Sequence, residues 1–205
     1  MVIHRAFDEV LRSWSHVAVL RAILDSAGGL TGNEIARSSG MHPRSALKAL
    51  TSLEELGIVR RQRGGRDHLF TLNRDHFLTQ EGLLPLYQAE QKYRSAIEGS
   101  LVALLKGHVV SAVIFGSVSR KQETPQSDLD LCCIVSSESK KEVVQEMLAS
   151  EAVPLYKKFG VKLAPVFFSL SEMKKKKRSW LVKEIRKEGK VIVGKKLEAL
   201  FSGTA

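Results

Sequence analysis

The sequence has few of the features that mark secreted proteins. It contains two cysteines in 205 residues, Cys132 and Cys133, and they are adjacent. Neighbouring side chains on a strand point to opposite faces, so the two thiols are not expected to bond to each other. No zinc-binding spacing is present either. We expect both cysteines to be reduced residues of the core.

Long apolar runs are also missing. No stretch approaches the roughly 20 residues that cross a bilayer. Charged residues interrupt the first twelve positions, where a signal peptide would carry its apolar region. These absences predict a cytoplasmic protein with no membrane contact. Acidic residues are scarce too: 22 Asp and Glu stand against 32 Lys and Arg, and the net charge of +10 favours polyanionic partners.

Helical spacing dominates the chain up to about residue 106. Apolar residues recur with that spacing from Phe7 to Leu24, and Thr31 with Glu34 predicts a capping box at the start of a short second helix. A third helix is expected from Pro43. Its predicted apolar face consists of Ala46, Leu47, Leu50, Leu53 and Leu56.

Two strand-like runs follow, 58–63 and 66–72, around the pair Gly64–Gly65. This pattern predicts a β-hairpin. Helix, short helix, turn, helix and hairpin together resemble the winged helix-turn-helix domains of small prokaryotic DNA-binding regulators over roughly residues 17–73. We therefore place a winged-helix domain at residues 1–75.

The resemblance implies that this domain binds DNA. The third helix would present Arg44, Ser45 and Lys48 to base edges. A winged helix that binds protein instead, or that folds over the second domain, stays open as the alternative. The wing would contact phosphates through its arginines, which are Arg60, Arg61, Arg63 and Arg66.

A helical stretch over residues 76–106 is expected to connect the two domains, with a break at Pro85 left open. Its apolar residues have three candidate partners: the first domain, the second domain or another copy of the chain. A homodimer is therefore one of the arrangements that the sequence allows.

The second half of the chain alternates strands and helices, and two expected strands flank a candidate site. The strand 108–115 ends in Gly116–Ser117, and the next strand, after a loop, carries Asp128 and Asp130. A period of two places both carboxylates on one side. Close carboxylates repel unless a cation lies between them, and hard oxygen ligands suit Mg²⁺. Gly116 permits close approach of a phosphate, and Ser117 adds a hydroxyl and an N–H.

Gly-Ser followed about ten residues later by Asp-x-Asp resembles the nucleotidyltransferase signature of the DNA polymerase β superfamily, over roughly residues 95–200. The resemblance implies a small α/β domain with a mixed sheet at residues 107–205. It also implies Mg²⁺ on Asp128 and Asp130, and ATP or another nucleoside triphosphate as substrate. The phosphates would contact three residues, which are Gly116, Ser117 and Arg120.

One part of the family's pattern is absent. A third carboxylate normally comes from a later strand, and the matching position here, Lys162 or Ala164, is not acidic. Glu172 lies beyond that strand. Two readings follow: an enzyme that works with two acids, or a protein that only senses nucleotide.

A basic run, 174–178, lies further on and is followed by Trp180. Most charge runs are solvated helix ends, and this one could instead widen an electropositive rim for nucleic acid. For Trp180 we expect core packing, with stacking on a base as the alternative.

The sequence thus predicts an α+β protein in which a mostly helical winged-helix domain is joined by a helix to an α/β nucleotidyltransferase domain. The predicted function is Mg²⁺-dependent transfer of a nucleotidyl group to an acceptor that the sequence does not identify. The alternative is a DNA-binding transcriptional regulator whose transferase fold senses nucleotide or is inactive.

Overall fold

The computed structural model describes residues 2–26, 28–64 and 67–201. It divides into two compact units, Met1–Lys92 and Tyr93–Ala205. The division falls within helix α5 (Leu84–Leu105), so the expected connecting helix contributes residues to both units. Within the described ranges, no helix has the length and apolar composition that a membrane crossing requires.

Among the described residues of unit 1, four helices precede the hairpin. The predicted first helix is divided in two, because the Ser13 hydroxyl accepts a hydrogen bond from the backbone N–H of His16 and so begins a new helix. The expected capping box is confirmed: Thr31 accepts from the N–H of Glu34, and Glu34 accepts from the N–H of Thr31. The helices are α1 (Ala6–Val10), α2 (Trp14–Leu24), α3 (Gly32–Ser38) and α4 (Pro43–Glu55).

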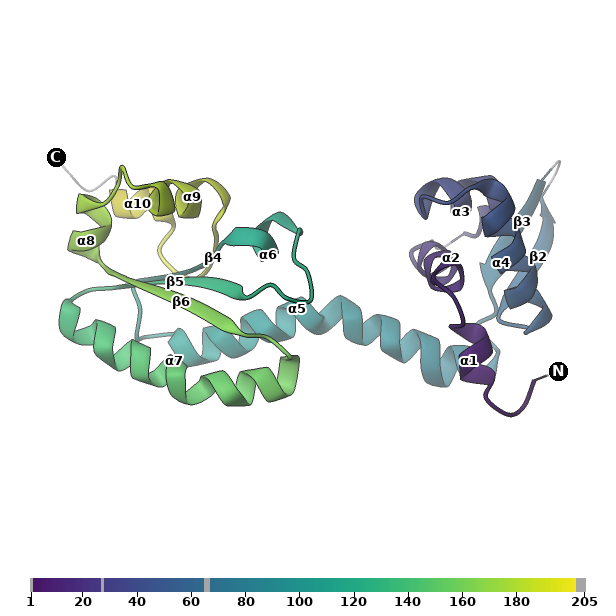
Figure 1. Ribbon diagram of the computed structural model, residues 1–205, viewed down its shortest axis with the longest axis horizontal. Coiled ribbons are helices and arrows are strands. Elements are labelled where there is room, and N and C mark those ends of the chain that lie inside the picture. Colours follow the sequence, from purple (N-terminus) through teal and green to yellow (C-terminus); the bar gives the residue numbers. More distant parts are fainter. Residues whose placement is uncertain (1, 27, 65–66, 202–205) are drawn as a thin grey trace. The chain divides into compact units, whose positions relative to one another are not determined.

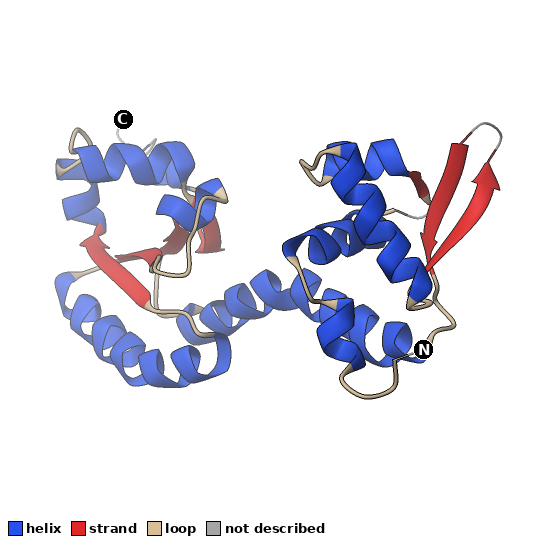
Figure 2. Cartoon of the chain, turned by 45° about the vertical axis from the view of Figure 1, so that its right-hand side comes forward, coloured by secondary structure: helices blue, strands red, loops and turns tan. Residues whose placement is uncertain are grey.

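The predicted β-hairpin is confirmed as β2 (Val59–Gly64) and β3 (Asp67–Leu72), which pair in antiparallel register. Figure 2 shows it as a pair of long strands beside the helices of unit 1. A third strand, β1 (Leu30–Thr31), pairs with β3, so the sheet order is β1-β3-β2. Two residues are too few to show an alternation, and β1 was therefore not predicted.

The core of unit 1 lies between α2, α3, α4 and the hairpin. Ile35, Leu50, Leu53 and Ile58 are completely buried in it. The predicted apolar face of α4 is wrong at Leu47, which is 49% exposed. With about 100° between successive residues, position 47 is turned away from the stripe formed by 46, 50 and 53.

The polypeptide continues as helix through Pro85. A π-helical turn, η1 (Thr79–Leu83), leads directly into α5, so proline does not break the helix. Proline has no backbone N–H and cannot donate the usual helical hydrogen bond. The π-helical turn before it already replaces this hydrogen-bond pattern. Within unit 1, a bidentate ion pair between Arg21 and Glu90 holds the first part of α5. Both N–O distances are 2.8 Å.

Unit 2 is built on a four-stranded sheet with the order β6-β5-β4-β7. β5 and β6 are parallel, whereas β4 is antiparallel to both of its neighbours. The mixed sheet predicted for this half is therefore confirmed. The strands are β4 (Ser111–Ile114), β5 (Leu129–Val135), β6 (Leu163–Ser169) and β7 (Lys190–Gly194).

Helices cover both faces of this sheet (Figure 1). The second part of α5 and α7 pack on one face, where Leu131 and Cys133 of β5 point. The other face carries Cys132 and Ile134 and is covered by α8, α9 and α10. Both cysteines are free and buried on opposite faces, as predicted. The helices of unit 2 beyond α5 are α6 (Gly116–Arg120), α7 (Glu138–Phe159), α8 (Leu170–Lys175), α9 (Trp180–Glu188) and α10 (Leu197–Phe201).

Candidate functional site

The predicted site lies where β4 gives way to α6, beside the start of β5. Because β4 and β5 are antiparallel, the end of one strand is next to the beginning of the other. The backbone N–H of Phe115 donates to the carbonyl of Asp130 at 3.1 Å, which fixes the turn against the carboxylate-bearing strand. Gly116 follows at the start of α6, and Ser117 is its half-buried neighbour.

Gly116 is required at this turn for two reasons. Its φ of +71° lies in the left-handed region that side chains disfavour. A Cβ at this position would meet the Asp130 carboxylate, at 2.0 Å from Oδ2 and 2.9 Å from Cγ. The missing side chain therefore makes the space that the Asp130 carboxylate occupies.

Negative charge surrounds Asp130. Burial raises the pKa of its carboxyl above the ordinary value, and the nearby charges of Glu184 and Asp128 raise it further, whereas Arg120 lowers it. Within the described residues, no ion pair neutralises Asp130 or Asp128. Such a site has spare electrostatic affinity for a cation.

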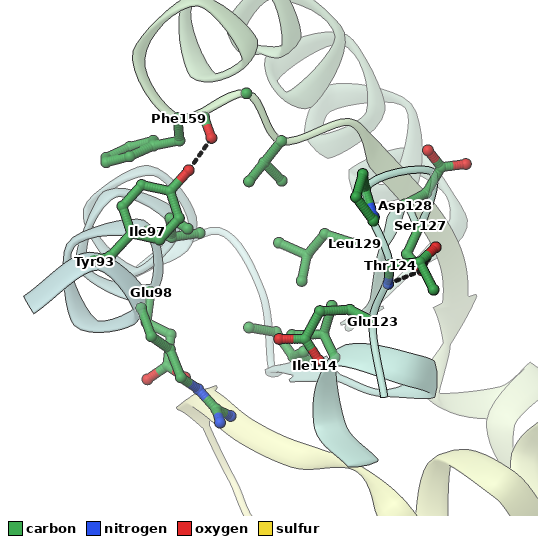
Figure 3. Close-up of a pocket in the computed structure, with 15 residues that line it drawn as sticks. Tyr93, Ile97, Glu98, Ile114, Glu123, Thr124, Ser127, Asp128, Leu129 and Phe159 are labelled. Atoms are coloured by element: carbon green, nitrogen blue, oxygen red, sulfur yellow. Dashed lines mark hydrogen bonds and ion pairs between the residues drawn. The ribbon is translucent and has the colours of Figure 1, made fainter. Parts of the chain in front are cut away.

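Asp128 differs from the prediction in one respect. It lies in the loop before β5, which begins at Leu129, so strand alternation alone does not set its direction. It is exposed, and it lies at the edge of a cavity of about 470 Å³ on the α5 and α7 side of the sheet (Figure 3).

The cavity has a mostly apolar wall. Ile97 of α5, Ile114 of β4 and Leu129 of β5 line it. Tyr93 and Phe159 close one side in an edge-to-face contact with ring centroids 6.1 Å apart, and the Tyr93 hydroxyl donates to the Phe159 carbonyl (Figure 3). Because Leu129 and Asp130 alternate on β5, this cavity lies across the sheet from the Asp130 carboxylate.

Arg120, predicted as a phosphate contact, forms ion pairs in this structure. Its Nη1 lies 3.2 Å from Glu184 Oε1 and also contacts Glu188. The two glutamates are four residues apart and so share one face of α9. Sequence reasoning did not place Glu184 near the site, because the i, i+4 spacing of the two acids does not show which element α9 packs against.

The third carboxylate is absent from β6 because Leu163–Ser169 contains no Asp or Glu. Ala164 is the partner of Asp130 in the parallel ladder, so no acid stands beside it on that strand. Glu172 lies in α8 and pairs with Lys141 at 2.6 Å. Among the described residues, no group of three or more His, Cys, Asp and Glu side chains is arranged to hold a metal ion.

The predicted DNA contacts of α4 are all exposed: Arg44, Ser45 and Lys48 lie on its outer side. Arg44 and Lys48 border a shallow surface hollow there.

In the wing, Arg60 pairs with Asp75 at 2.8 Å and Arg61 with Glu54 at 3.1 Å. Arg63 is exposed on β2. Arg66 falls outside the described residues.

The expected core packing of Trp180 is wrong. Its side chain is 75% exposed, because it is the first residue of α9 and points away from the buried stripe of Val182 and Ile185. The basic run before it covers the end of α8 and the following turn, and all five of its residues are exposed, as expected for a solvated helix end.

Two family models match the chain, one in each half. The IclR helix-turn-helix domain matches residues 17–63, and the nucleotidyltransferase domain matches residues 95–195. No curated protein matches the sequence significantly.

Solved structures with similarity include an ArsR family transcriptional regulator. It is 24% identical, with 42% of this chain and 88% of that chain covered and a TM-score of 0.32. A toxin–antitoxin structure with AMP-PNP is 16% identical, covers 51% of this chain and 80% of its own, and has a TM-score of 0.34. A mutant of the toxin–antitoxin pair MntA–HpeT is 14% identical with the same coverages and the same TM-score. By its two family models, the chain carries an IclR-type helix-turn-helix domain followed by a nucleotidyltransferase domain.

Proposed function

We propose that the chain transfers a nucleotidyl group from a nucleoside triphosphate, with Mg²⁺, and that its helix-turn-helix domain binds DNA. The contact between Gly116 and Asp130 carries the proposal. The Asp130 carboxylate fills the space that a Cβ at this turn would need, so the acid and the turn lie together. The charge of Asp128 acts on the same carboxylate.

The residues present fit a magnesium ion. Asp128 and Asp130 supply hard oxygen donors, and the surplus of negative charge around Asp130 favours a divalent cation. Mg²⁺ commonly takes one or two carboxylates and completes its shell with water and substrate phosphates, so a third protein carboxylate is not required for binding. When bound, the ion would neutralise phosphate charge and make an acceptor hydroxyl more acidic.

The protein's own residues would then position the triphosphate. Gly116 and Ser117 offer backbone N–H groups and a hydroxyl to its oxygens. An acceptor hydroxyl oxygen forms a bond to the α-phosphorus, the bond to the bridging oxygen breaks, and pyrophosphate leaves with that electron pair. The hydroxyl proton passes to solvent. Arg120 could join the phosphates only by leaving Glu184 and Glu188.

A second candidate function is nucleotide sensing by a DNA-binding regulator. The observation that favours it is Ala164 beside Asp130, where a third carboxylate would support transfer. In this case the triphosphate would bind at the same turn and stay intact.

One experiment separates the two candidates. The full chain is incubated with Mg²⁺ and nucleoside triphosphates labelled at the α-phosphate, in the presence of cell RNA or cell protein. Transfer of label by the wild type, lost in both Asp128→Asn and Asp130→Asn, supports the transferase. Saturable binding of the triphosphate without transfer, lost in the same variants, supports the sensor. If the wild type shows neither transfer nor binding, both candidate functions are excluded.

For the first domain we propose contacts to DNA by Arg44, Ser45 and Lys48 of α4 and by the arginines of the wing. The support is the exposure of the three α4 residues and of Arg63. Arg60 and Arg61 form ion pairs with acidic partners, so we assign them a smaller share of the DNA contacts.

A further inference from the structure

Almost all of the chain's excess charge lies in one short segment. Residues 174–196 contain eleven Lys or Arg residues and two glutamates, a surplus of nine out of a net charge of +10. Both glutamates, Glu184 and Glu188, are already engaged by Arg120. The acidic residues of this segment therefore do not neutralise its own Lys and Arg residues.

Five cations of this segment lie along the end of α8, the turn after it and α9. They are exposed, and within the part of the chain that the structure describes none of them forms an ion pair. They are Lys175, Lys177, Arg178, Lys183 and Lys187. Together with Trp180 they form what we name the α8–α9 basic surface.

Trp180 is the aromatic centre of this surface. At 75% its exposure is the highest among the large hydrophobic residues that the structure describes. Among the described residues it has no stacking or cation–π partner. The Ser179 hydroxyl caps α9 by accepting from the N–H of Val182, so the residue that carries the ring is the first of a well-started helix.

The helix presents ring and charges together. Trp180, Lys183 and Lys187 are spaced by three and four residues, which places them on one face of α9. The opposite side buries Val182 and Ile185 in the core. A rigid element thus holds an aromatic plane beside a row of ammonium groups over roughly 10 Å, given the rise of about 1.5 Å per residue.

We propose that the α8–α9 basic surface binds single-stranded nucleic acid, with a base stacked on Trp180 and backbone phosphates on the surrounding Lys and Arg. Every base has a π face, and flexible cations follow a phosphate backbone regardless of sequence. A duplex satisfies only the second feature because its bases are already stacked. This surface belongs to unit 2, whereas the proposed DNA-binding residues of α4 and the wing belong to unit 1.

The test uses the full chain and a fluorescein-labelled twelve-residue oligo(dT) or oligo(U), followed by anisotropy at several salt concentrations. Trp180→Ala should weaken binding roughly tenfold, and Trp180→Tyr should recover most of the loss, since base stacking is the readout. Lys183→Ala/Lys187→Ala should lower the salt slope by about 1.4, at about 0.7 per phosphate on a single strand. In Trp14→Phe, the remaining Trp180 emission should be quenched by the strand.

Matched controls separate this surface from the rest of the molecule. Trp14→Ala removes an exposed tryptophan of unit 1, and Lys140→Ala removes an exposed lysine of α7. Both variants should keep the wild-type affinity for the strand, and the titration contains no nucleoside triphosphate, which makes the result independent of the transfer reaction. Unchanged affinity in Trp180→Ala would overturn the proposal. So would equal losses on single strand and duplex, or a Trp180-dependent preference for anionic phospholipid vesicles over the strand.

Discussion

Gly116 and Asp130 are in such close contact that one added methyl group on the glycine would overlap the carboxylate, at 2.0 Å from Oδ2. We therefore expect Gly116→Ala to displace Asp130 and to abolish nucleotide binding. The substitution also places a side chain at a φ of +71°, which costs about 1–2 kcal/mol of stability. The free energy of urea unfolding and the affinity for Mg²⁺-ATP measure the two effects.

Gly107→Ala is the matched control for this prediction. Gly107 has a φ of +88°, but a Cβ there meets nothing within 4 Å. It should lose a similar amount of stability and keep its nucleotide affinity. If both variants bind nucleotide equally well, the Gly116–Asp130 contact has no functional role.

Most of the fold could be predicted from local sequence patterns. The capping box of Thr31 and Glu34, the Gly-Gly hairpin and the alternation of the adjacent cysteines depend on neighbours in sequence, and each was predicted from the residues alone. Strand β1 was missed because its two residues acquire strand geometry only through pairing with β3. Leu47 is exposed because the angle around the helix, and not the leucine content, decides which residues of α4 are buried.

The candidate site was predictable only in part. Gly116, Ser117, Asp128 and Asp130 lie within one short segment, so their spacing was visible. The position of Glu184 depends on how α9 packs against α6, and no local pattern fixes that distance. The sequence did not determine whether Trp180 is buried. A tryptophan after a basic run can lie in the core or on the surface, and the orientation of its helix decides which.

We expect the two cysteines to be unreactive in the native protein. Both side chains are completely buried. Burial raises the pKa of Cys133 to about 12 and that of Cys132 further still, so neither forms a thiolate at neutral pH. An Ellman titration should detect no thiols in the native chain and two after denaturation in guanidinium. Rapid reaction of either thiol in the native protein would show that β5 is more open than its packing indicates.

The stability of unit 1 should fall on mild acidification. His16 is buried, and burial lowers its pKa below 6.5; the charge of Arg12 lowers it further, against a hydrogen bond with the Glu9 carbonyl that raises it. The unfolded chain therefore binds the proton more readily than the folded one. The stabilisation is complete above pH 6.5 and is lost as the pH falls through the lower folded value. Hydrogen exchange of the peptide 14–24 at pH 7.5 and 5.5, corrected for intrinsic rates, measures it.

His16→Gln should flatten this pH response, and His68→Gln, at an exposed position of β3, should leave it as in the wild type. A wild-type chain whose α2 protection is the same at both pH values would contradict the assignment.

DNA binding by unit 1 should depend on the exposed cations of α4 and β2. Removing one phosphate contact lowers the salt slope on duplex DNA by about 0.9. Arg63→Ala removes one proposed phosphate contact and Lys48→Ala one proposed base-edge contact. The double variant Lys48→Ala/Arg63→Ala should therefore weaken duplex binding and reduce the slope by about 0.9 in gel-shift titrations. Lys140→Ala, an exposed lysine of α7, serves as the charge-matched control. Equal affinities for all three proteins would place the DNA contacts elsewhere.

A calorimetric titration of ATP into the full chain, with and without Mg²⁺, tests whether Asp128 and Asp130 bind a magnesium–nucleotide complex. We expect saturable, Mg²⁺-dependent binding that weakens at least tenfold, about 1.4 kcal/mol, in Asp130→Asn and in Asp128→Asn. Binding of equal strength in the wild type and Asp130→Asn, or in the presence of a chelator, would contradict it.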